Sequence, residues 1–343
     1  DEDGVGVDLL HLDPEHAELD EPLGMTDTTL LGNGIVVTGH ITPTSVESQV
    51  LSNGAVAWKG DRILRVGPEA DLRREFPDAD YLDARGGLIV PGLINLHHHF
   101  YSALARGLDP KTPMTDFGEV LDRLWWRLDR ALDLETVSSS AELSAADCVR
   151  SGCTTVFDHH ASPSTMAGSL DAIADAIEEA GLSAALCYEI TDRNGHDQAV
   201  AGLEENLRFV LHRQRPRIRG LLGLHASFTL RDETMKLAAE RRTDSMGCHI
   251  HLAEDPIDVM ASREAFGVGP VKRLQQFGLL DSRCLLAHCI HLTAGEYRTI
   301  AEHGAVAIHN PESNANNGVG RLNVVDTAAH GCLVGLGTDG MSS

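Results

Sequence analysis

Residues 90–99 read Val-Pro-Gly-Leu-Ile-Asn-Leu-His-His-His, an apolar segment that ends in three histidines. On a β-strand, successive side chains point to opposite faces, so His97 and His99 share one face while His98 points the other way. Neutral imidazole is a common ligand of zinc and similar ions. The segment therefore predicts half of a metal site at the end of a buried strand. Three adjacent histidines could also form an ordinary polar loop or a core cluster.

Later segments repeat this arrangement of an apolar strand followed by a chemically active side chain. Three of them end in a histidine or a carboxylate: residues 248–254 with His251 and Glu254, residues 285–289 with His288, and residues 333–340 with Asp339. Such residues at the ends of successive parallel strands are typical of a (β/α)8 barrel, because its chemistry lies at the carboxyl-terminal mouth. The segments together predict this fold.

From residue 88 onward, apolar strands alternate with amphipathic helices, which is the pattern of parallel βα units. The predicted strands are Leu93–His97, Thr154–Asp158, Ala184–Glu189, Leu221–His225, Gly247–His251, Cys284–His288, Ala305–His309 and Val334–Thr338. The helix signals agree, because Thr293-x-x-Glu296 is a capping box and Gly181 and Gly304 lie at predicted helix ends. The predicted fold class is α/β, a (β/α)8 TIM-type barrel over residues 88–343.

The segments that flank this barrel lead to further expectations. Residues 25–87 hold short β-type runs between Asn-Gly, Gly-Asp and Pro turns, which predicts the N-terminal part of a small β-sandwich. Residues 1–24 are acidic and unpatterned, so we expect a non-native or disordered leader. The sequence stops four residues after Asp339. We therefore expect the barrel to be truncated after its eighth strand.

Composition excludes several classes of protein. The chain has 343 residues, enough for a barrel of roughly 250. A net charge of −23 argues against a nucleic-acid-binding surface, and no apolar run approaches the roughly 20 residues of a membrane span. Seven cysteines without a Cys-x-x-Cys pair predict reduced thiols in the cytoplasm. The acidic, lysine-poor composition favours a halophilic protein, although an ordinary acidic bacterial protein is the alternative.

The order of the chemically active residues resembles the amidohydrolase superfamily, in its mononuclear deaminase branch. The segments that carry this resemblance are Pro91–Asn95, Ile250–Glu254, Ala287–Cys289, His309–Asn314 and Gly337–Gly340. They resemble the group that contains s-triazine chlorohydrolases, 8-oxoguanine deaminase and S-adenosylhomocysteine deaminase. Phe100–Gly107 and Thr154–Ser162 most resemble the SsnA-type aminohydrolases within it. The resemblance runs from Thr29 to the last residue, and implies a barrel with a small β-sandwich that a C-terminal segment completes.

A hydrolytic metal site holds its ion with a few neutral or anionic ligands and leaves one position for water, whose pKa the ion lowers. His97, His99, His251 and Asp339 would supply three nitrogens and one oxygen. We expect one divalent metal ion there, Zn²⁺ in the first place and Fe²⁺ as the alternative. His249 has the same strand parity as His251 but lies two residues deeper, so we expect it to be a core residue.

Three residues are candidates for catalysis. Glu254 follows a ligand by three residues and is placed for general acid–base work. Asp339 could accept a hydrogen bond from the water and help to deprotonate it. His288 reaches the same mouth and could stabilise the tetrahedral adduct. The alternatives are that Glu254 is a solvated residue at a helix start and that His288 is structural.

Four residues are candidates for substrate binding. His225 ends the fourth predicted strand, where the resemblance implies a substrate contact. Tyr101 and Arg106 follow the first ligands and are expected in a recognition loop, although Arg106 could instead be an ion-pair partner. His160, in the run Asp158-His159-His160, could bind substrate or a second ion, or fill the barrel rim.

These patterns predict a metal-dependent hydrolase of a C–N bond that is not a peptide bond, most simply a deaminase of an amino-substituted heterocycle. One alternative is hydrolytic loss of another leaving group, such as halide, from a triazine-like ring. Another is a catalytically inactive structural or interaction member of the fold. The expected partner is a small heterocyclic substrate, with no nucleic acid and no membrane, and homo-oligomer formation stays open.

Overall fold

The computed structural model describes residues 28–41, 46–108, 111 and 113–340. The chain forms two compact units, and the boundary between them falls between Gly92 and Leu93. None of the helices in the described ranges is long and apolar enough to cross a membrane. The expected leader over residues 1–24 lies outside the described residues.

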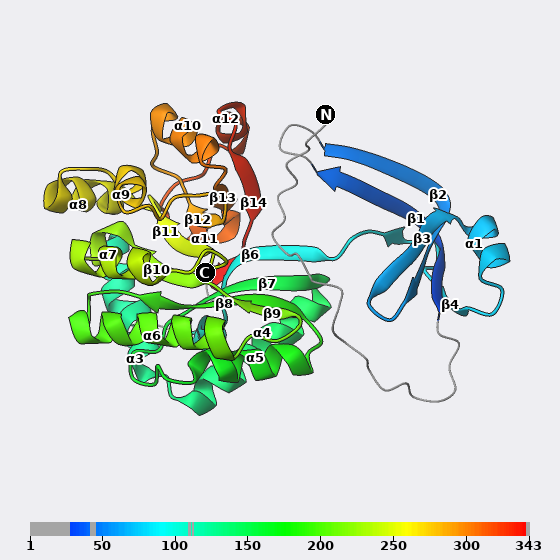
Figure 1. Cartoon of the computed structure of the whole chain (residues 1–343), viewed down its shortest axis with the longest axis horizontal. Coiled ribbons are helices and arrows are strands. Elements are labelled where there is room, and N and C mark those ends of the chain that lie inside the picture. Colours follow the sequence, from blue (N-terminus) through cyan, green and yellow to red (C-terminus); the bar gives the residue numbers. More distant parts are fainter. Residues whose placement is uncertain (1–27, 42–45, 109–110, 112, 341–343) are drawn as a thin grey trace. The chain divides into compact units, whose positions relative to one another are not determined.

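The N-terminal unit, blue to light blue in Figure 1, is a mixed five-stranded sheet in the order β3-β2-β1-β4, with β5 also paired to β1. Its elements are β1 (Thr29–Ile41), β2 (Val46–Lys59), β3 (Arg62–Pro68), α1 (Glu69–Glu75), β4 (Asp80–Asp83) and β5 (Leu88–Ile89). Gly60 and Asp61 form a two-residue hairpin turn, because Lys59 pairs with Arg62 and Gly60 has a φ of 55°. A small core of Leu30, Ala55, Ala57 and Leu72 holds α1 against the sheet.

The second unit is a (β/α)8 barrel, so the predicted fold is confirmed (Figure 1). Its strands are β6 (Leu93–His99), β7 (Cys153–His160), β8 (Ser183–Ile190), β10 (Leu222–Ala226), β11 (Cys248–Leu252), β12 (Cys284–His288), β13 (Val306–His309), β14 (Leu333–Leu336) and β15 (Asp339–Gly340). β14 pairs with β13 and β15 pairs with β6, so residues 333–340 act as one interrupted eighth strand that closes the ring. A further short strand that the sequence did not predict, β9 (Ile218–Gly220), pairs with β8.

Helices connect the barrel strands. The longer ones are α4 (Leu134–Arg150), α5 (Ser169–Glu179), α6 (His196–His212), α7 (Asp232–Arg241), α8 (Pro256–Phe266), α9 (Pro270–Gln276) and α10 (Ala294–Glu302). Shorter turns are η1 (Phe100–Ala105), α2 (Phe117–Val120), η2 (Leu121–Trp125), α3 (Trp126–Ala131), η3 (Ser227–Thr229), α11 (Pro311–Asn316) and α12 (Val324–Ala329). The capping box of Thr293 and Glu296 is present at the start of α10, and Gly181 and Gly304 follow α5 and α10 with positive φ, as predicted.

One strand contact in the barrel leaves no room for a side chain. Gly223 of β10 pairs with Glu189 of β8, and a Cβ at Gly223 would lie 2.4 Å from the carbonyl oxygen of Tyr188. An alanine there must push two hydrogen-bonded strands apart. We expect Gly223→Ala to destabilise the protein by about 1–3 kcal/mol, which lowers Tm by several degrees in thermal unfolding. Gly39→Ala is the control, because a Cβ at Gly39 would have no atom of the described residues within 4 Å. Equal Tm values for both variants would contradict the expectation.

Candidate active site

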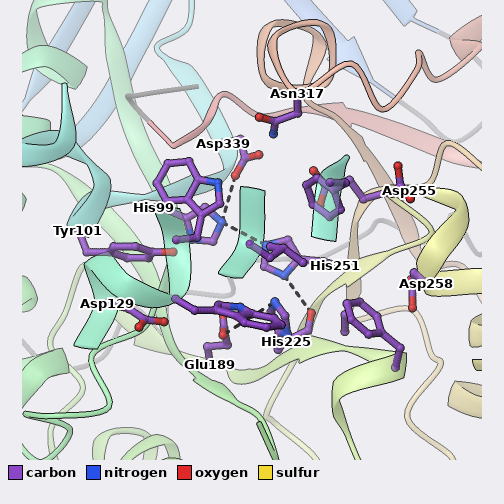
Figure 2. Close-up of a pocket in the computed structure, with 17 residues that line it drawn as sticks. His99, Tyr101, Asp129, Glu189, His225, His251, Asp255, Asp258, Asn317 and Asp339 are labelled. Carbon is purple, nitrogen blue, oxygen red and sulfur yellow. Dashed lines mark hydrogen bonds and ion pairs between the residues drawn. The ribbon is translucent and has the colours of Figure 1, made fainter. Parts of the chain in front are cut away.

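Four side chains from three parts of the barrel meet at the carboxyl ends of the strands: His97 and His99 from β6, His251 from β11 and Asp339 from β15. One ligand atom of each lies within 4.8 Å of those of the others. His99 Nε2 lies 3.0 Å from Asp339 Oδ1 and 3.1 Å from His251 Nε2, and His97 Nε2 lies 3.3 Å from the same carboxylate oxygen. Figure 2 shows His99, His251 and Asp339 side by side in the pocket.

Backbone carbonyls set the orientation of two of these imidazoles. His99 Nδ1 lies 2.5 Å from the carbonyl oxygen of His159, and His251 Nδ1 lies 2.9 Å from that of His225. A carbonyl oxygen can only accept, so each Nδ1 donates its proton, and each Nε2 is the nitrogen that can bind a further proton or a metal ion. A hydrogen bond from the second ring nitrogen is the usual support of a metal-binding histidine.

This arrangement fits a divalent cation. The lone pairs of His99 Nε2 and His251 Nε2 face each other at 3.1 Å beside a carboxylate, and both rings are buried. Buried acceptors that face one another need a proton or a cation between them. Three imidazole nitrogens and one carboxylate oxygen form a donor set that suits zinc and similar ions.

The charges in the cluster point the same way. Burial alone would raise the pKa of Asp339, but hydrogen bonds with His97 and His99 bring it well below its ordinary value. Burial lowers the pKa of His97 to about 3, although Asp339 opposes the shift. Burial also acts to lower the pKa of His99, but there the hydrogen bond with Asp339 prevails and raises it to about 8. A cation that binds here would displace the proton that His99 and Asp339 otherwise hold.

Several residues at the strand ends have a strained backbone. Ala253, His288, Cys289 and Asp339 have φ values of 49°, 74°, 52° and 62°, a region that residues other than glycine rarely adopt. Asp258 stabilises one of them, because its carboxylate accepts the Ala253 N–H at 2.6 Å. Such strain is typical of sites where side chains are held in functional positions.

A second cluster lies beside the first and consists of Glu254, His288 and Asp339. His288 Nε2 lies 3.5 Å from Glu254 Oε2 and 3.8 Å from Asp339 Oδ2. Its Nδ1 lies 2.8 Å from Asn314 Oδ1, an acceptor, so Nε2 keeps a lone pair that faces the two carboxyl groups. Burial, followed by the charge of Asp339, raises the pKa of Glu254 well above its ordinary value. Burial and the neighbouring carboxylate therefore favour the protonated form of Glu254.

Two further histidines on the ligand strands, His98 and His249, lie where strand parity places them. His98 points to the opposite face of β6, with Nδ1 2.9 Å from Thr338 Oγ1. His249 lies deeper than His251, with Nε2 2.9 Å from His97 Nδ1. His249 is thus a core residue that also orients His97, a role that the sequence did not predict.

A pocket opens next to these clusters, and the structure brings two of the four predicted substrate residues to it. Tyr101 and His225 line the pocket, as Figure 2 shows. His160 does not line it, because its Nε2 lies 2.8 Å from Ser162 Oγ in a buried position. Arg106 lies on the surface and forms an ion pair with Asp147 at 3.2 Å, beside a different cavity.

Sequence reasoning missed most of the pocket wall. The missed residues are the aromatic side chains Phe117, Trp125, Trp126 and Phe228, the aliphatic side chains Leu121 and Ala226, and the polar side chains Asp129, Glu189, Asp255, Asp258 and Asn317. Most of them lie in short helices and loops, where hydrophobic periodicity gives no position. Glu189 alone carried a signal, since an acidic residue near the end of an apolar barrel strand faces the mouth.

Comparison with known proteins places this architecture in a family. The sequence pattern of the amidohydrolase family matches residues 88–343. The chain belongs to the amidohydrolase family. A bacterial imidazolonepropionase-like composite domain also matches residues 54–79 of the N-terminal unit.

Two curated relatives of this amidohydrolase are named 5-methylthioadenosine/S-adenosylhomocysteine deaminase. The protein from Desulforudis audaxviator is 32% identical over 84% of this chain and 66% of its own length. The protein from Moorella thermoacetica is 32% identical over 90% of this chain and 71% of its own length. The amidohydrolase chain therefore spans about two thirds of the length of these relatives.

Solved structures share the fold. An adenosine deaminase from Xanthomonas campestris with bound zinc has a TM-score of 0.74 and 26% identity, over 92% of this chain and 70% of that one. Guanine deaminase from E. coli has a TM-score of 0.78 and 22% identity, over 91% and 74% of the two chains. Atrazine chlorohydrolase from Arthrobacter aurescens TC1, in complex with zinc, has a TM-score of 0.79 and 21% identity, over 92% and 72%.

Proposed function

We propose that this amidohydrolase removes an amino group from a heterocyclic substrate by metal-dependent hydrolysis. The observation that supports this reaction most strongly is the meeting of a metal-type donor cluster with a second cluster suited to proton transfer. His97, His99, His251 and Asp339 form the first, and Asp339 also belongs to the second. The names of the curated relatives, which are deaminases, support the same class of reaction.

His97, His99, His251 and Asp339 would hold one divalent ion. We propose Zn²⁺, because the nitrogen and oxygen donors suit it and because the related adenosine deaminase structure contains zinc; Fe²⁺ is the alternative. When bound, the ion supplies a Lewis acid that lowers the pKa of water at this position.

The side chains of the second cluster would move the protons. Asp339 is ionised and accepts a proton from the attacking water. Glu254, whose raised pKa favours the protonated form, donates a proton to the ring nitrogen next to the carbon that bears the amino group. His288 accepts a hydrogen bond from the water through Nε2 and keeps this contact with the oxygen of the tetrahedral adduct, which stabilises the adduct. The amino nitrogen then takes the proton held by Asp339, the C–N bond breaks and ammonia leaves. The remaining hydroxyl proton returns to Glu254 as the oxygen becomes a carbonyl.

The pocket would hold the substrate ring. We propose that Tyr101 and His225 contact it and that the aromatic wall, including Trp126, packs against its face. His160 and Arg106 lie outside the pocket, so direct substrate contact by these two residues is not part of the proposal.

The test is ammonia release by the zinc-loaded 343-residue chain from adenosine, methylthioadenosine, guanine and aminotriazines. We expect ammonia from at least one of these rings. No ammonia from any ring would contradict the deaminase proposal. Chloride release from chlorotriazines without ammonia from any amino heterocycle would instead favour hydrolysis of another leaving group, and neither product would favour a structural member of the fold.

We also propose the compartment and the salt environment in which this amidohydrolase works. All seven cysteines are free thiols, and six of them are buried, which supports a reducing compartment such as the cytoplasm. The net charge of −23 supports a protein adapted to high salt, where screening removes self-repulsion. An optimum of thermal stability at low salt would contradict the second proposal.

A further inference from the structure

We propose that Glu189 recognises the substrate and that it selects amino heterocycles which present hydrogen-bond donors and carry no anionic group. The inference rests on the proposed deaminase function, since the pocket is taken to hold the ring. Glu189 lies near the end of β8 and lines the pocket. Figure 2 shows it beside His225, across the pocket from Asp339 in this view.

Glu189 belongs to a buried group of charges. Arg193 contacts the carboxylate of Asp129 and approaches Glu189, with Nη2 3.5 Å from Oε1. The exposed fractions of the three side chains are 6% for Arg193, 2% for Asp129 and 4% for Glu189. Both carboxyl groups contact the same guanidinium nitrogen of Arg193, and Arg193 is not among the residues that line this pocket.

His225 faces Glu189 with a lone pair. Its Nδ1 lies 2.7 Å from Thr229 Oγ1, and the Thr229 hydroxyl lies 3.1 Å from the carbonyl oxygen of Ala226. The carbonyl can only accept, so the hydroxyl donates to it and must accept from His225 Nδ1. The proton of His225 is therefore on Nδ1. Its Nε2 is an acceptor, 4.0 Å from Glu189 Oε1.

The position of His159 determines which oxygen of the Glu189 carboxyl group would carry a proton. Its Nε2 lies 3.1 Å from the carbonyl oxygen of Leu224 and therefore donates, which leaves Nδ1 as a buried acceptor without a hydrogen-bond partner among the described residues. That Nδ1 lies 3.7 Å from Glu189 Oε2. If Glu189 is protonated, the proton belongs on Oε2, toward His159. Oε1 is thus an acceptor in both protonation states.

Two acceptors, Glu189 Oε1 and His225 Nε2, consequently lie 4.0 Å apart at the edge of the pocket. A substrate donor that enters there can bond to both of them. A substrate edge with acceptors alone leaves His225 Nε2 unpaired, at a cost of about 1–3 kcal/mol, and leaves Glu189 Oε1 with only its 3.5 Å contact to Arg193. A ring amino group and the hydroxyl groups of a ribose are two sources of such donors. Either source supplies the same chemistry.

The charge of the pocket lining selects against anionic substrates. Six carboxyl groups line the pocket: Asp129, Glu189, Glu254, Asp255, Asp258 and Asp339. No lysine or arginine is among the lining residues in the described part of the chain. A phosphate or carboxylate on the substrate would meet repulsion from these groups and find no lysine or arginine side chain in that lining to pair with.

Matched substrate pairs test this selection in the zinc-loaded wild-type chain. Adenine and 2,6-diaminopurine differ by one ring amino group, and 2′,3′-dideoxyadenosine and adenosine differ by the ribose hydroxyls. We expect the donor-bearing member of at least one pair to have a kcat/KM higher by about tenfold or more, and adenosine to exceed adenosine 5′-monophosphate. If the two members of each donor pair have nearly equal kcat/KM, the inference is overturned. If adenosine 5′-monophosphate is turned over as well as adenosine, the proposed selection against anionic groups is overturned.

Variants assign the effect to Glu189. Glu189→Leu removes the acceptor. The ratio of kcat/KM between the donor-bearing substrate and its partner should therefore fall toward one. Glu189→Gln should retain it, because an amide oxygen can face Arg193 while the amide nitrogen donates to His159. The control is Glu204→Gln, an exposed residue of α6 (53% exposed). A Leu variant with normal Tm and metal content that keeps the preference, or a Gln variant that loses it, would overturn the assignment.

A binding measurement separates this inference from the proposed function. Trp125 and Trp126 line the pocket, so their fluorescence reports occupancy in the metal-free protein. We expect 2,6-diaminopurine to bind more tightly than adenine, or adenosine more tightly than its dideoxy analogue, and the Leu variant to lose the difference. If no ring releases ammonia, the deaminase proposal fails, but these affinities still test the role of Glu189. Equal affinities within both pairs would overturn the role proposed for Glu189.

Discussion

Replacement of Glu254 by glutamine is expected to lower kcat by about 10²–10⁴-fold and to leave the metal content unchanged. The carboxyl of Glu254 is buried beside His288, with its Oε2 3.5 Å from His288 Nε2. Its pKa is raised well above the ordinary value, first by burial, which favours the protonated carboxyl group. Glutamine preserves the shape of the side chain but cannot transfer that proton. Steady-state ammonia release and elemental analysis measure the two quantities.

The matched control for this variant is Glu240→Gln, an exposed glutamate of α7 (61% exposed). It should leave kcat unchanged. Near-normal turnover by a metal-replete Glu254→Gln protein would show that Glu254 is not the general acid. Loss of metal together with activity would assign it to the support of the metal site instead.

The double variant His97→Ala/His99→Ala is expected to lose both the metal and all measurable turnover. It removes two of the four donors whose ligand atoms lie within 4.8 Å of one another. Two remaining donors do not provide the three or four protein ligands that a zinc site needs. Elemental analysis of the dialysed protein measures the loss, with ammonia release as the second readout.

His98→Ala is the control for this experiment, because His98 lies between the two residues in sequence but bonds to Thr338 on the other face of β6. It should keep the metal. If the double variant retains as much metal as the wild type, the ion is held elsewhere. Loss of metal in His98→Ala with a normal Tm would contradict the separation of the two faces.

The barrel could be predicted because its buried strands leave a simple trace in the sequence. Runs such as Leu285–His288 are apolar on both faces, since helices cover one side and the barrel interior the other. Each run ends in a side chain that strand geometry must direct to the mouth. His97, His99, His251 and Asp339 could therefore be grouped across about 240 residues without any structure.

The pocket could not be predicted in the same way. Trp126 and Asp129 reach it from the short helix α3, and Asn317 follows the short helix α11; no periodic pattern fixes the direction of these segments. In the sequence, Arg106 looked as suitable for substrate binding as Tyr101. In the structure Arg106 is exposed and pairs with Asp147, and the chain turns at the next residue, Gly107, which has a φ of 73°. Hydrogen bonds between distant residues, such as that between His249 and His97, depend on the packing of the interior.

X-ray absorption spectroscopy at the metal edge, with elemental analysis of the purified chain, tests the central claim most directly. The account predicts about one ion per chain with imidazole nitrogen and carboxylate oxygen ligands at about 2.0–2.2 Å. Absence of metal would contradict it, as would thiolate scattering at about 2.3 Å or a second ion at about 3.5–4 Å.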